Sequence, residues 1–134
     1  MRRVVVTGLG LISPLGCGVD NSWRHLIAGR SGIDSITLFD TADHACQIAG
    51  EVPRVDGQLC PDGGDDGLFA IHDWIKAREQ KRLEPFIVYA LVAAKQALQD
   101  SGWLEILEHN EEAQLRTGVT VSYTHLTLPT TPYV

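Results

Sequence analysis

Cysteine and histidine are the residue types in this chain that most readily serve as nucleophiles, bases or metal ligands. The chain has three cysteines and five histidines, and their spacing contains no CxxC, HxxxH or HExxH pattern. Cys17 lies between two glycines just before a predicted helix, where a helix N-terminus can lower the pKa of a thiol. No histidine stands in a recognisable relation to Cys17. We therefore predict a small buried thiol there, no catalytic residue and no metal site.

A glycine-rich turn, Gly8–Gly18, follows a β-branched run at Arg2–Thr7 and precedes that helix. Strand, Gly-x-Gly turn and helix together form the phosphate cradle of dinucleotide-binding folds, in which backbone N–H groups face the pyrophosphate. Here Ser13 replaces the third glycine and Pro14 removes an N–H group. The acidic residue expected about twenty positions later has no good candidate, because Asp34 lies in a predicted loop. We predict a structural turn without a cofactor, with a nucleotide-binding α/β oxidoreductase as an alternative.

Four basic residues gather in one short stretch, at Lys76, Arg78, Lys81 and Arg82, with Glu79 as the acidic residue among them. Because the whole chain has a net charge of −6, the stretch is a local positive patch. Such a patch can steer an acidic partner toward its binding surface. The solvated start of a helix is the plainer interpretation. A small acidic interaction module that uses only this patch is the alternative to an enzyme.

The elements that would position these residues follow an α/β pattern. The longest predicted helix covers Leu83–Ser101, with apolar residues at spacings of three and four, and Lys95, Gln96 and Gln99 on the polar face. Its alanines would let another helix or a sheet approach closely. The other predicted elements are a buried strand at Arg2–Thr7, a helix at Ser22–Ala28, a loop at Ser31–Asp43, an edge strand at Gln47–Val52, a loop at Pro53–Gly67 and a strand at Arg116–Val121.

Length and composition restrict the class of protein. The 134 residues suit one domain, and 44% of them are hydrophobic, which is ordinary for a folded protein. No apolar run approaches the roughly eighteen residues that span a bilayer, and the valines after Arg3 are too few for a signal peptide. The negative net charge disfavours a general nucleic-acid binder. We predict a cytoplasmic protein that has neither nucleic acid nor a membrane as a partner.

The final segment, Val121–Val134, differs from the rest of the chain. It contains no Asp, Glu, Lys or Arg, and its first ten residues, VSYTHLTLPT, look like the in-frame translation of a transposase adapter used in sequencing libraries. A natural strand or hairpin is the alternative. We predict that residues 1–120 are part of one domain and that residues 121–134 are an artefactual tail, with the natural sequence diverging near Thr120.

Several segments together resemble one family, in the same order and at similar spacing across residues 1–119. The segments are VVVTGLGLISPLGCGV at 4–19, SW and LIAGRSGI within 22–33, FDT at 39–41, IAGEVP at 48–53, REQKRLEPFIVYAL, AA, QAL and DSGW within 78–103, and RTGV at 116–119. Each alone is weakly specific, whereas the set is highly specific. It resembles the N-terminal part of β-ketoacyl-[acyl-carrier-protein] synthases of the type II, elongating kind.

The resemblance implies an incomplete N-terminal part of a thiolase-like α/β fold with αβαβα layers. It implies an acyltransferase that elongates fatty acids by decarboxylative Claisen condensation with malonyl-acyl carrier protein, as a homodimer without an organic cofactor. The family's nucleophilic cysteine and its two histidines match no position here, because they lie downstream of Arg116–Val119, so the chain is predicted to be inactive by itself. Arg78, Lys81 and Arg82 match family positions that meet the acidic acyl carrier protein.

Overall fold

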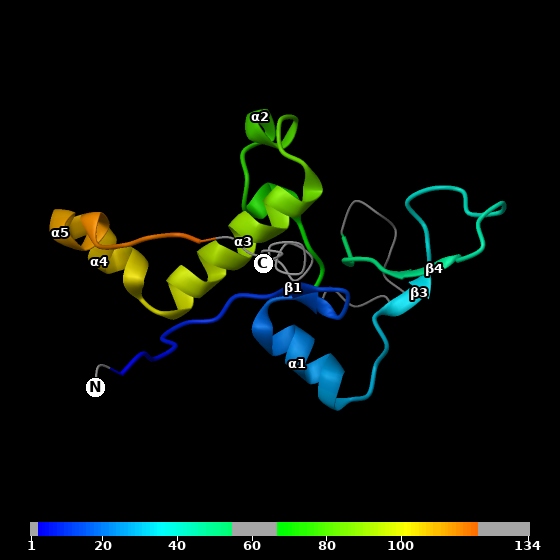
Figure 1. Ribbon diagram of the computed structural model, residues 1–134, viewed down its shortest axis with the longest axis horizontal. Coiled ribbons are helices and arrows are strands. Elements are labelled where there is room, and N and C mark those ends of the chain that lie inside the picture. Colours follow the sequence, from blue (N-terminus) through cyan, green and yellow to red (C-terminus); the bar gives the residue numbers. More distant parts are fainter. Residues whose placement is uncertain (1–2, 55–66, 121–134) are drawn as a thin grey trace, which may run out of the picture. The chain divides into compact units, whose positions relative to one another are not determined.

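The computed structural model describes residues 3–54 and 67–120, and the chain divides into two compact units, residues 1–103 and 104–134 (Figure 1). Residues 55–66 of the loop predicted at Pro53–Gly67 lie outside the described residues, as do the last residue of the strand predicted at Arg116–Val121 and the whole tail predicted at Val121–Val134. The longest described helix has 16 residues, and none of the described helices is long and apolar enough to cross a membrane.

The described part of the first unit combines two short antiparallel strand pairs with three α-helices and one 3-10 helix. In chain order its elements are β1 (Ile12–Ser13), β2 (Gly16–Cys17), α1 (Val19–Ile27), β3 (Ile33–Ser35), β4 (Ile48–Gly50), the 3-10 helix η2 (Ile71–Asp73), α2 (Ala77–Gln80) and α3 (Pro85–Asp100). β1 pairs with β2 so that Ile12 faces Cys17, and β3 pairs with β4 so that Asp34 faces Ala49. The described residues form no larger sheet.

The N-terminal segment lies closely against α3. A Cβ atom added at Gly10 would lie 1.9 Å from the backbone oxygen of Ala93, and one added at Gly8 would lie 2.3 Å from that of Ala97. Only glycine therefore allows this approach, and the small side chains of Ala93 and Ala97 leave room for it. The sequence predicts that the alanines of this helix let a helix or a sheet approach closely; what approaches here is an irregular segment, through its own glycines.

The core of the first unit lies where α3 meets the segment before α2. Its buried residues are Phe69, Ile75, Val88 and Val92, and Val92 is only 1% exposed. The rings of Phe69 and Tyr89 meet edge to face at 5.4 Å, a favoured aromatic geometry. Ile75 and the half-buried Leu83 bracket α2 in the sequence, so both flanks of that short helix contact the core.

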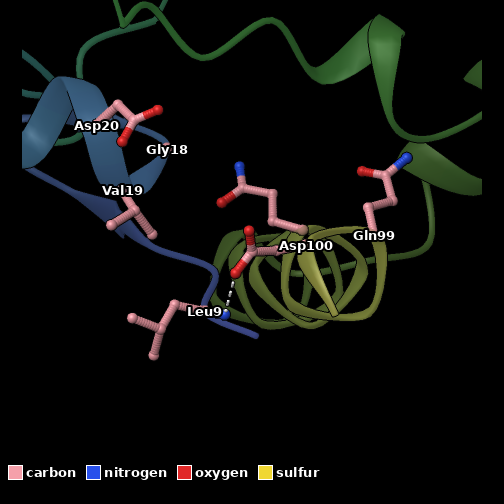
Figure 2. Close-up of a pocket in the computed structure, with 7 residues that line it drawn as sticks. Leu9, Gly18, Val19, Asp20, Gln99 and Asp100 are labelled. Atoms are coloured by element: carbon pink, nitrogen blue, oxygen red, sulfur yellow. Dashed lines mark hydrogen bonds between the residues drawn. The ribbon is translucent and has the colours of Figure 1, made fainter. Parts of the chain in front are cut away.

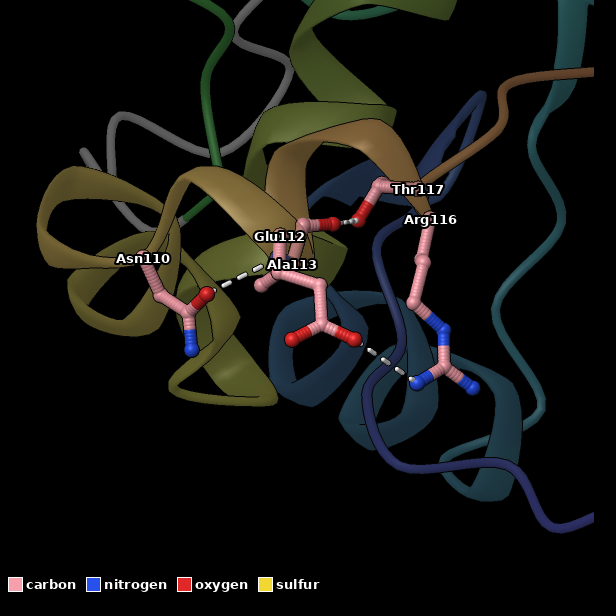
Figure 3. A network of polar contacts seen from close by, with 5 residues as sticks. All are labelled: Asn110, Glu112, Ala113, Arg116 and Thr117. Atoms are coloured by element: carbon pink, nitrogen blue, oxygen red, sulfur yellow. Dashed lines mark hydrogen bonds and ion pairs between the residues drawn. The ribbon is translucent and has the colours of Figure 1, made fainter.

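The described part of the second unit contains α4 (Trp103–His109) and α5 (Glu111–Leu115). The boundary between the units falls after Trp103, the first residue of α4. Figure 3 shows how α5 is held at both ends. The side-chain oxygen of Asn110 accepts a hydrogen bond from Ala113 N at 3.0 Å, and the Thr117 hydroxyl donates to Ala113 O at 2.7 Å. Arg116 and Glu112 form an exposed ion pair at 3.6 Å, worth little by itself. The Asn110 cap defines the start of the helix.

The two predicted helices of the first unit are confirmed, with shifted starts. The helix predicted at Leu83–Ser101 is α3, which begins at Pro85 and is followed by Gly102 in the left-handed region at φ +67°. The helix predicted at Ser22–Ala28 is α1, whose N-cap is Gly18 and not a capping polar side chain. Its apolar residues Trp23, Leu26 and Ile27 are more than half exposed, and Ser22 is the buried residue.

The two predicted core strands are wrong for the described residues. Residues 3–7 form no strand, and Val4, Val5 and Val6 are 97%, 72% and 80% exposed. Residues 117–120 form no strand either, and Arg116 ends α5. A strand needs a neighbour to satisfy its backbone groups, and the described residues place none beside either segment. The edge strand predicted at Gln47–Val52 is confirmed as β4, whereas its partner β3 lies where a loop was predicted.

Candidate functional site

Cys17 lies at the end of β2, next to the N-cap of α1, as the sequence predicts. Its Sγ accepts a hydrogen bond from Gln96 Nε2 at 3.3 Å. Burial raises the pKa of the Cys17 thiol, although the Gln96 hydrogen bond acts in the opposite direction. The histidine of α1, His25, contacts the Leu15 backbone oxygen and Arg30 instead. A neutral thiol without a base is a poor nucleophile, and that Cys17 is not catalytic stays a prediction.

The backbone N–H groups of the glycine-rich turn are already used within the first unit. Leu9 N donates to Asp100 Oδ2 at 2.9 Å and Leu11 N donates to Gln96 Oε1 at 2.9 Å. Further along, Cys17 N donates to the Gly67 oxygen at 2.7 Å. A phosphate cradle needs such N–H groups to point at the ligand. The structural turn predicted from the sequence is therefore the better interpretation, and the dinucleotide alternative loses its donors.

Gln96 is a structural residue that the sequence pattern misplaced. The amphipathic pattern put Gln96 on the polar face of α3, yet it is half-buried and bridges the Leu11 amide and the Cys17 thiol. A polar side chain within a helix gives no signal of this role, since the partner segment is more than 70 residues away in sequence. Lys95 and Gln99 are exposed as predicted.

A shallow pocket of about 280 Å³ lies between the N-terminal segment, the start of α1 and the end of α3 (Figure 2). Its charged lining consists of two exposed carboxylates, Asp20 and Asp100, and Figure 2 shows Asp100 bonded to Leu9 N. Two carboxylates disfavour an anionic ligand. No group of three or more metal-ligating residues occurs in the described parts of the chain. The described lining thus offers two carboxylates but no cysteine, serine, threonine, lysine or histidine beside them to act as a nucleophile or partner.

Glu51 was not among the predicted sites, yet its carboxylate accepts several hydrogen bonds from the chain that follows β3. Its carboxylate accepts from the Thr37 hydroxyl at 2.7 Å, from Thr37 N at 3.2 Å and from Leu38 N at 3.3 Å. The Thr37 hydroxyl is the largest cause that lowers the pKa of Glu51, with the two amides and the Arg54 charge acting in the same direction. Glu51 holds the chain that leaves β3 against the end of β4. Its role is structural.

The basic cluster, Arg78, Lys81 and Arg82, is the remaining candidate. All three side chains are exposed, on α2 and the turn that leads to α3. None of them forms an ion pair with another described residue. Glu79 lies among them in the sequence but forms no ion pair with them, so the three positive charges outnumber it and the arrangement is able to attract an acidic surface.

Comparison with known proteins decides the family. The model of the family described as "Beta-ketoacyl synthase, N-terminal domain" matches residues 1–131. The chain belongs to this family. The match includes most of the predicted tail, and the interpretation of residues 121–134 as adapter-derived stays a prediction. The fold is that of a ketosynthase N-terminal domain, an incomplete part of a thiolase-like α/β fold.

Curated members of the β-ketoacyl synthase family match most of this chain. The 3-oxoacyl-[acyl-carrier-protein] synthase 2 of Rhizobium meliloti is 42% identical over 121 residues, which cover 90% of this chain and 26% of that protein. The enzyme of the same name from Vibrio cholerae is 38% identical over 120 residues, 90% of this chain and 25% of that protein. The chain therefore spans about a quarter of the length of the curated relatives that it matches.

A solved structure agrees with the family assignment. The ishigamide ketosynthase/chain length factor matches with a TM-score of 0.59 and 37% identity, over 75% of this chain and 22% of that chain. At this level of identity the β-ketoacyl synthase family replaces the oxidoreductase and the small interaction module as the interpretation of the chain. The resemblance predicted from its sequence segments is confirmed.

Proposed function

We propose that the chain is the N-terminal part of an elongating β-ketoacyl-acyl carrier protein synthase. The enzyme is an acyltransferase that joins a carrier-bound acyl chain to malonyl-acyl carrier protein, with loss of carbon dioxide. The family match over residues 1–131 carries the proposal, and relatives named 3-oxoacyl-[acyl-carrier-protein] synthase 2 support it. The whole enzyme is proposed to be a cytoplasmic homodimer without an organic cofactor.

The 134-residue chain by itself is proposed to be inactive. Condensation needs a nucleophile for the acyl group, groups that promote decarboxylation and donors for the oxyanion. Cys17 is a half-buried thiol bonded to Gln96 and has no base beside it. The catalytic groups are assigned to the part of the enzyme beyond residue 120.

The contribution of this chain to function is proposed to be docking of the carrier protein on Arg78, Lys81 and Arg82. Their exposure and the absence of ion pairs with other described residues support the proposal. Charges of this kind raise the rate of encounter with an acidic protein and lose strength as salt screens them. The surface would act before chemistry, by raising the local concentration of carrier-bound substrate.

The test uses the full-length synthase, with its downstream sequence recovered from source DNA. Lys81→Glu with Arg82→Glu should raise the KM for acyl-carrier protein severalfold at low salt, because exposed charge pairs contribute about 0.2–1 kcal/mol each and reversal adds repulsion. Turnover of a small acyl thioester that lacks the carrier protein should remain unchanged. The docking effect should shrink at moderate salt.

A matched control separates docking from net charge. Arg3→Glu with Lys95→Glu changes the net charge by the same amount at two exposed positions outside the cluster, and its KM should stay near that of the wild type. Failure of the wild-type synthase to form a 3-oxoacyl product, or binding of a nicotinamide dinucleotide, would refute the proposed activity. An unchanged carrier KM in the Lys81/Arg82 double variant at low salt would refute the docking role.

A further inference from the structure

The helix that begins the basic cluster is too short to be stable alone. α2 comprises four residues, Ala77–Gln80, and its N-cap residue Lys76 makes no side-chain capping bond. Isolated helices shorter than about 12 residues are marginal in water. The conformation of this segment must therefore come from contacts outside the helix.

Gln80 provides such a contact. Its Nε2 donates to the Ile75 backbone oxygen at 2.6 Å, and Ile75 is a core residue that is only 7% exposed. Within α2, Gln80 is half-buried while Ala77, Arg78 and Glu79 are exposed. The hydrogen bond therefore joins the last residue of the helix to the core residue that precedes its N-cap. The bond therefore links the two ends of the segment Ile75–Gln80 on the side that faces the core.

The basic residues lie on either side of this contact in the sequence. Arg78 precedes Gln80 by two positions, and Lys81 and Arg82 follow it directly. Arg82 N donates to the Glu79 oxygen at 2.9 Å, and the next residue, Leu83, packs against the core. Figure 1 shows α2 joined to the start of α3 by this short turn. Since Gln80 directs the inner side of the segment to the core, its neighbours are left to face solvent.

We propose that Gln80 is a positioning residue for carrier-protein docking. Its hydrogen bond to Ile75 holds Arg78, Lys81 and Arg82 on one ordered turn, so that their charges are presented together. The inference rests on the proposed docking function of these three residues. Gln80 itself carries no charge and is given no direct contact with the partner.

The first experiment replaces Gln80 by methionine in the full-length synthase. Gln80→Met keeps a long, unbranched side chain of similar helix propensity but removes the donor. We expect the KM for acyl-carrier protein to rise about threefold, as when part of an exposed charge interaction is lost. The kcat and the KM for the carrier-free thioester should stay unchanged.

The control is a second glutamine that makes the same kind of bond. Gln114 Nε2 donates to the Leu107 oxygen at 2.5 Å in the second unit, where no basic cluster is assigned. Gln114→Met should leave both KM values unchanged. If Gln80→Met impairs the carrier-free substrate as strongly as the carrier-bound one, its role is structural and the inference is wrong.

A double-mutant cycle distinguishes the positioning role of Gln80 from the docking role of the basic cluster. In the Lys81→Glu, Arg82→Glu background, Gln80→Met should have little further effect on the carrier KM, since residues that act through one another are not additive. Equal effects in both backgrounds would overturn the positioning role. If the charge reversal raises the carrier KM but Gln80→Met in the wild type does not, the positioning role alone is refuted. If the charge reversal has no effect, docking and positioning fail together.

Discussion

Replacing Gly10 by alanine tests the contact between the N-terminal segment and α3. The added Cβ would lie 1.9 Å from the Ala93 backbone oxygen, whereas real Cβ atoms essentially never come closer than 3.0 Å. The segment must then retreat by about 1 Å, taking ordinary contact distances as the guide. Because the obstructing atom belongs to the backbone, no change of rotamer in α3 relieves the overlap.

The two hydrogen bonds made by the neighbours of Gly10 set the free energy that is lost when the segment leaves α3. Leu9 N to Asp100 and Leu11 N to Gln96 are both 2.9 Å long and exposed, and a typical hydrogen bond contributes about 0.5–1.5 kcal/mol net. Detaching the segment therefore costs about 1–3 kcal/mol, which is comparable with the cost of about 1–3 kcal/mol for keeping an overpacked contact. Detachment is the expected response, because the obstructing oxygen belongs to the α3 backbone and residues 3–7 have no strand partner among the described residues. The variant should open locally while the core stays folded.

Amide hydrogen exchange resolves this local opening. In Gly10→Ala the amides of Leu9 and Leu11 should exchange about tenfold faster or more, the equivalent of about 1.4 kcal/mol. Exchange at the core residues Val88 and Val92 should not change. Gly118→Ala, where an added Cβ meets nothing within 4 Å, should leave every rate unaltered. Wild-type exchange at Leu9 and Leu11 in Gly10→Ala would refute the close contact.

Three further predictions follow from single residues or segments. Because burial raises the pKa of the Cys17 thiol, iodoacetamide should alkylate Cys17 more slowly at pH 7 than it alkylates the exposed Cys46. A stable acyl adduct on Cys17 in intact mass spectrometry would contradict the structural role of Cys17. The lowered pKa of Glu51 means that the carboxylate stabilises the β3–β4 hairpin above its ordinary pKa, and this contribution is lost as pH falls through the lower pKa of the folded state. Acid should therefore release the Thr37 amide in hydrogen exchange, and Glu51→Gln should abolish that pH dependence; a wild-type pH profile in Glu51→Gln would count against the clamp. For residues 121–134, source DNA should carry adapter bases after the Thr120 codon, whereas an intact genomic read through VSYTHLTLPT would make the tail natural.

The sequence predicted best the elements whose determinants are local. The apolar spacing and the glycine stop signal located α3, since a helix satisfies its own backbone groups. The strand predicted at Arg2–Thr7 required neighbours that its own residues cannot supply, and the described chain places none there. No element was predicted where α4 and α5 lie, and the capping residue Asn110 is the local signal that could have marked the start of α5.

The same distinction applies to the candidate site residues. The close approach at Gly8 and Gly10 and the bridging role of Gln96 depend on atoms far away in sequence, so a single sequence could suggest a turn and an amphipathic helix but not their contact. The clamp at Glu51 joins residues 14 apart and carries no motif. Residue type alone therefore indicated neither the bridge made by Gln96 nor the clamp made by Glu51.

The basic cluster is the site that depends least on distant parts of a larger protein. Every contact that orders it lies between Ile75 and Leu83 or in the adjacent core: the Gln80 bond to Ile75, the Arg82 bond to Glu79 and the packing of Leu83. A surface made from contiguous residues can be retained in a chain that spans about a quarter of the length of its relatives. A catalytic centre has a stricter requirement, because nucleophile, base and oxyanion donors must meet from separate elements. For this reason the described residues can present an ordered positive surface without a catalytic centre, and the role we propose for them is to bring substrate to the enzyme.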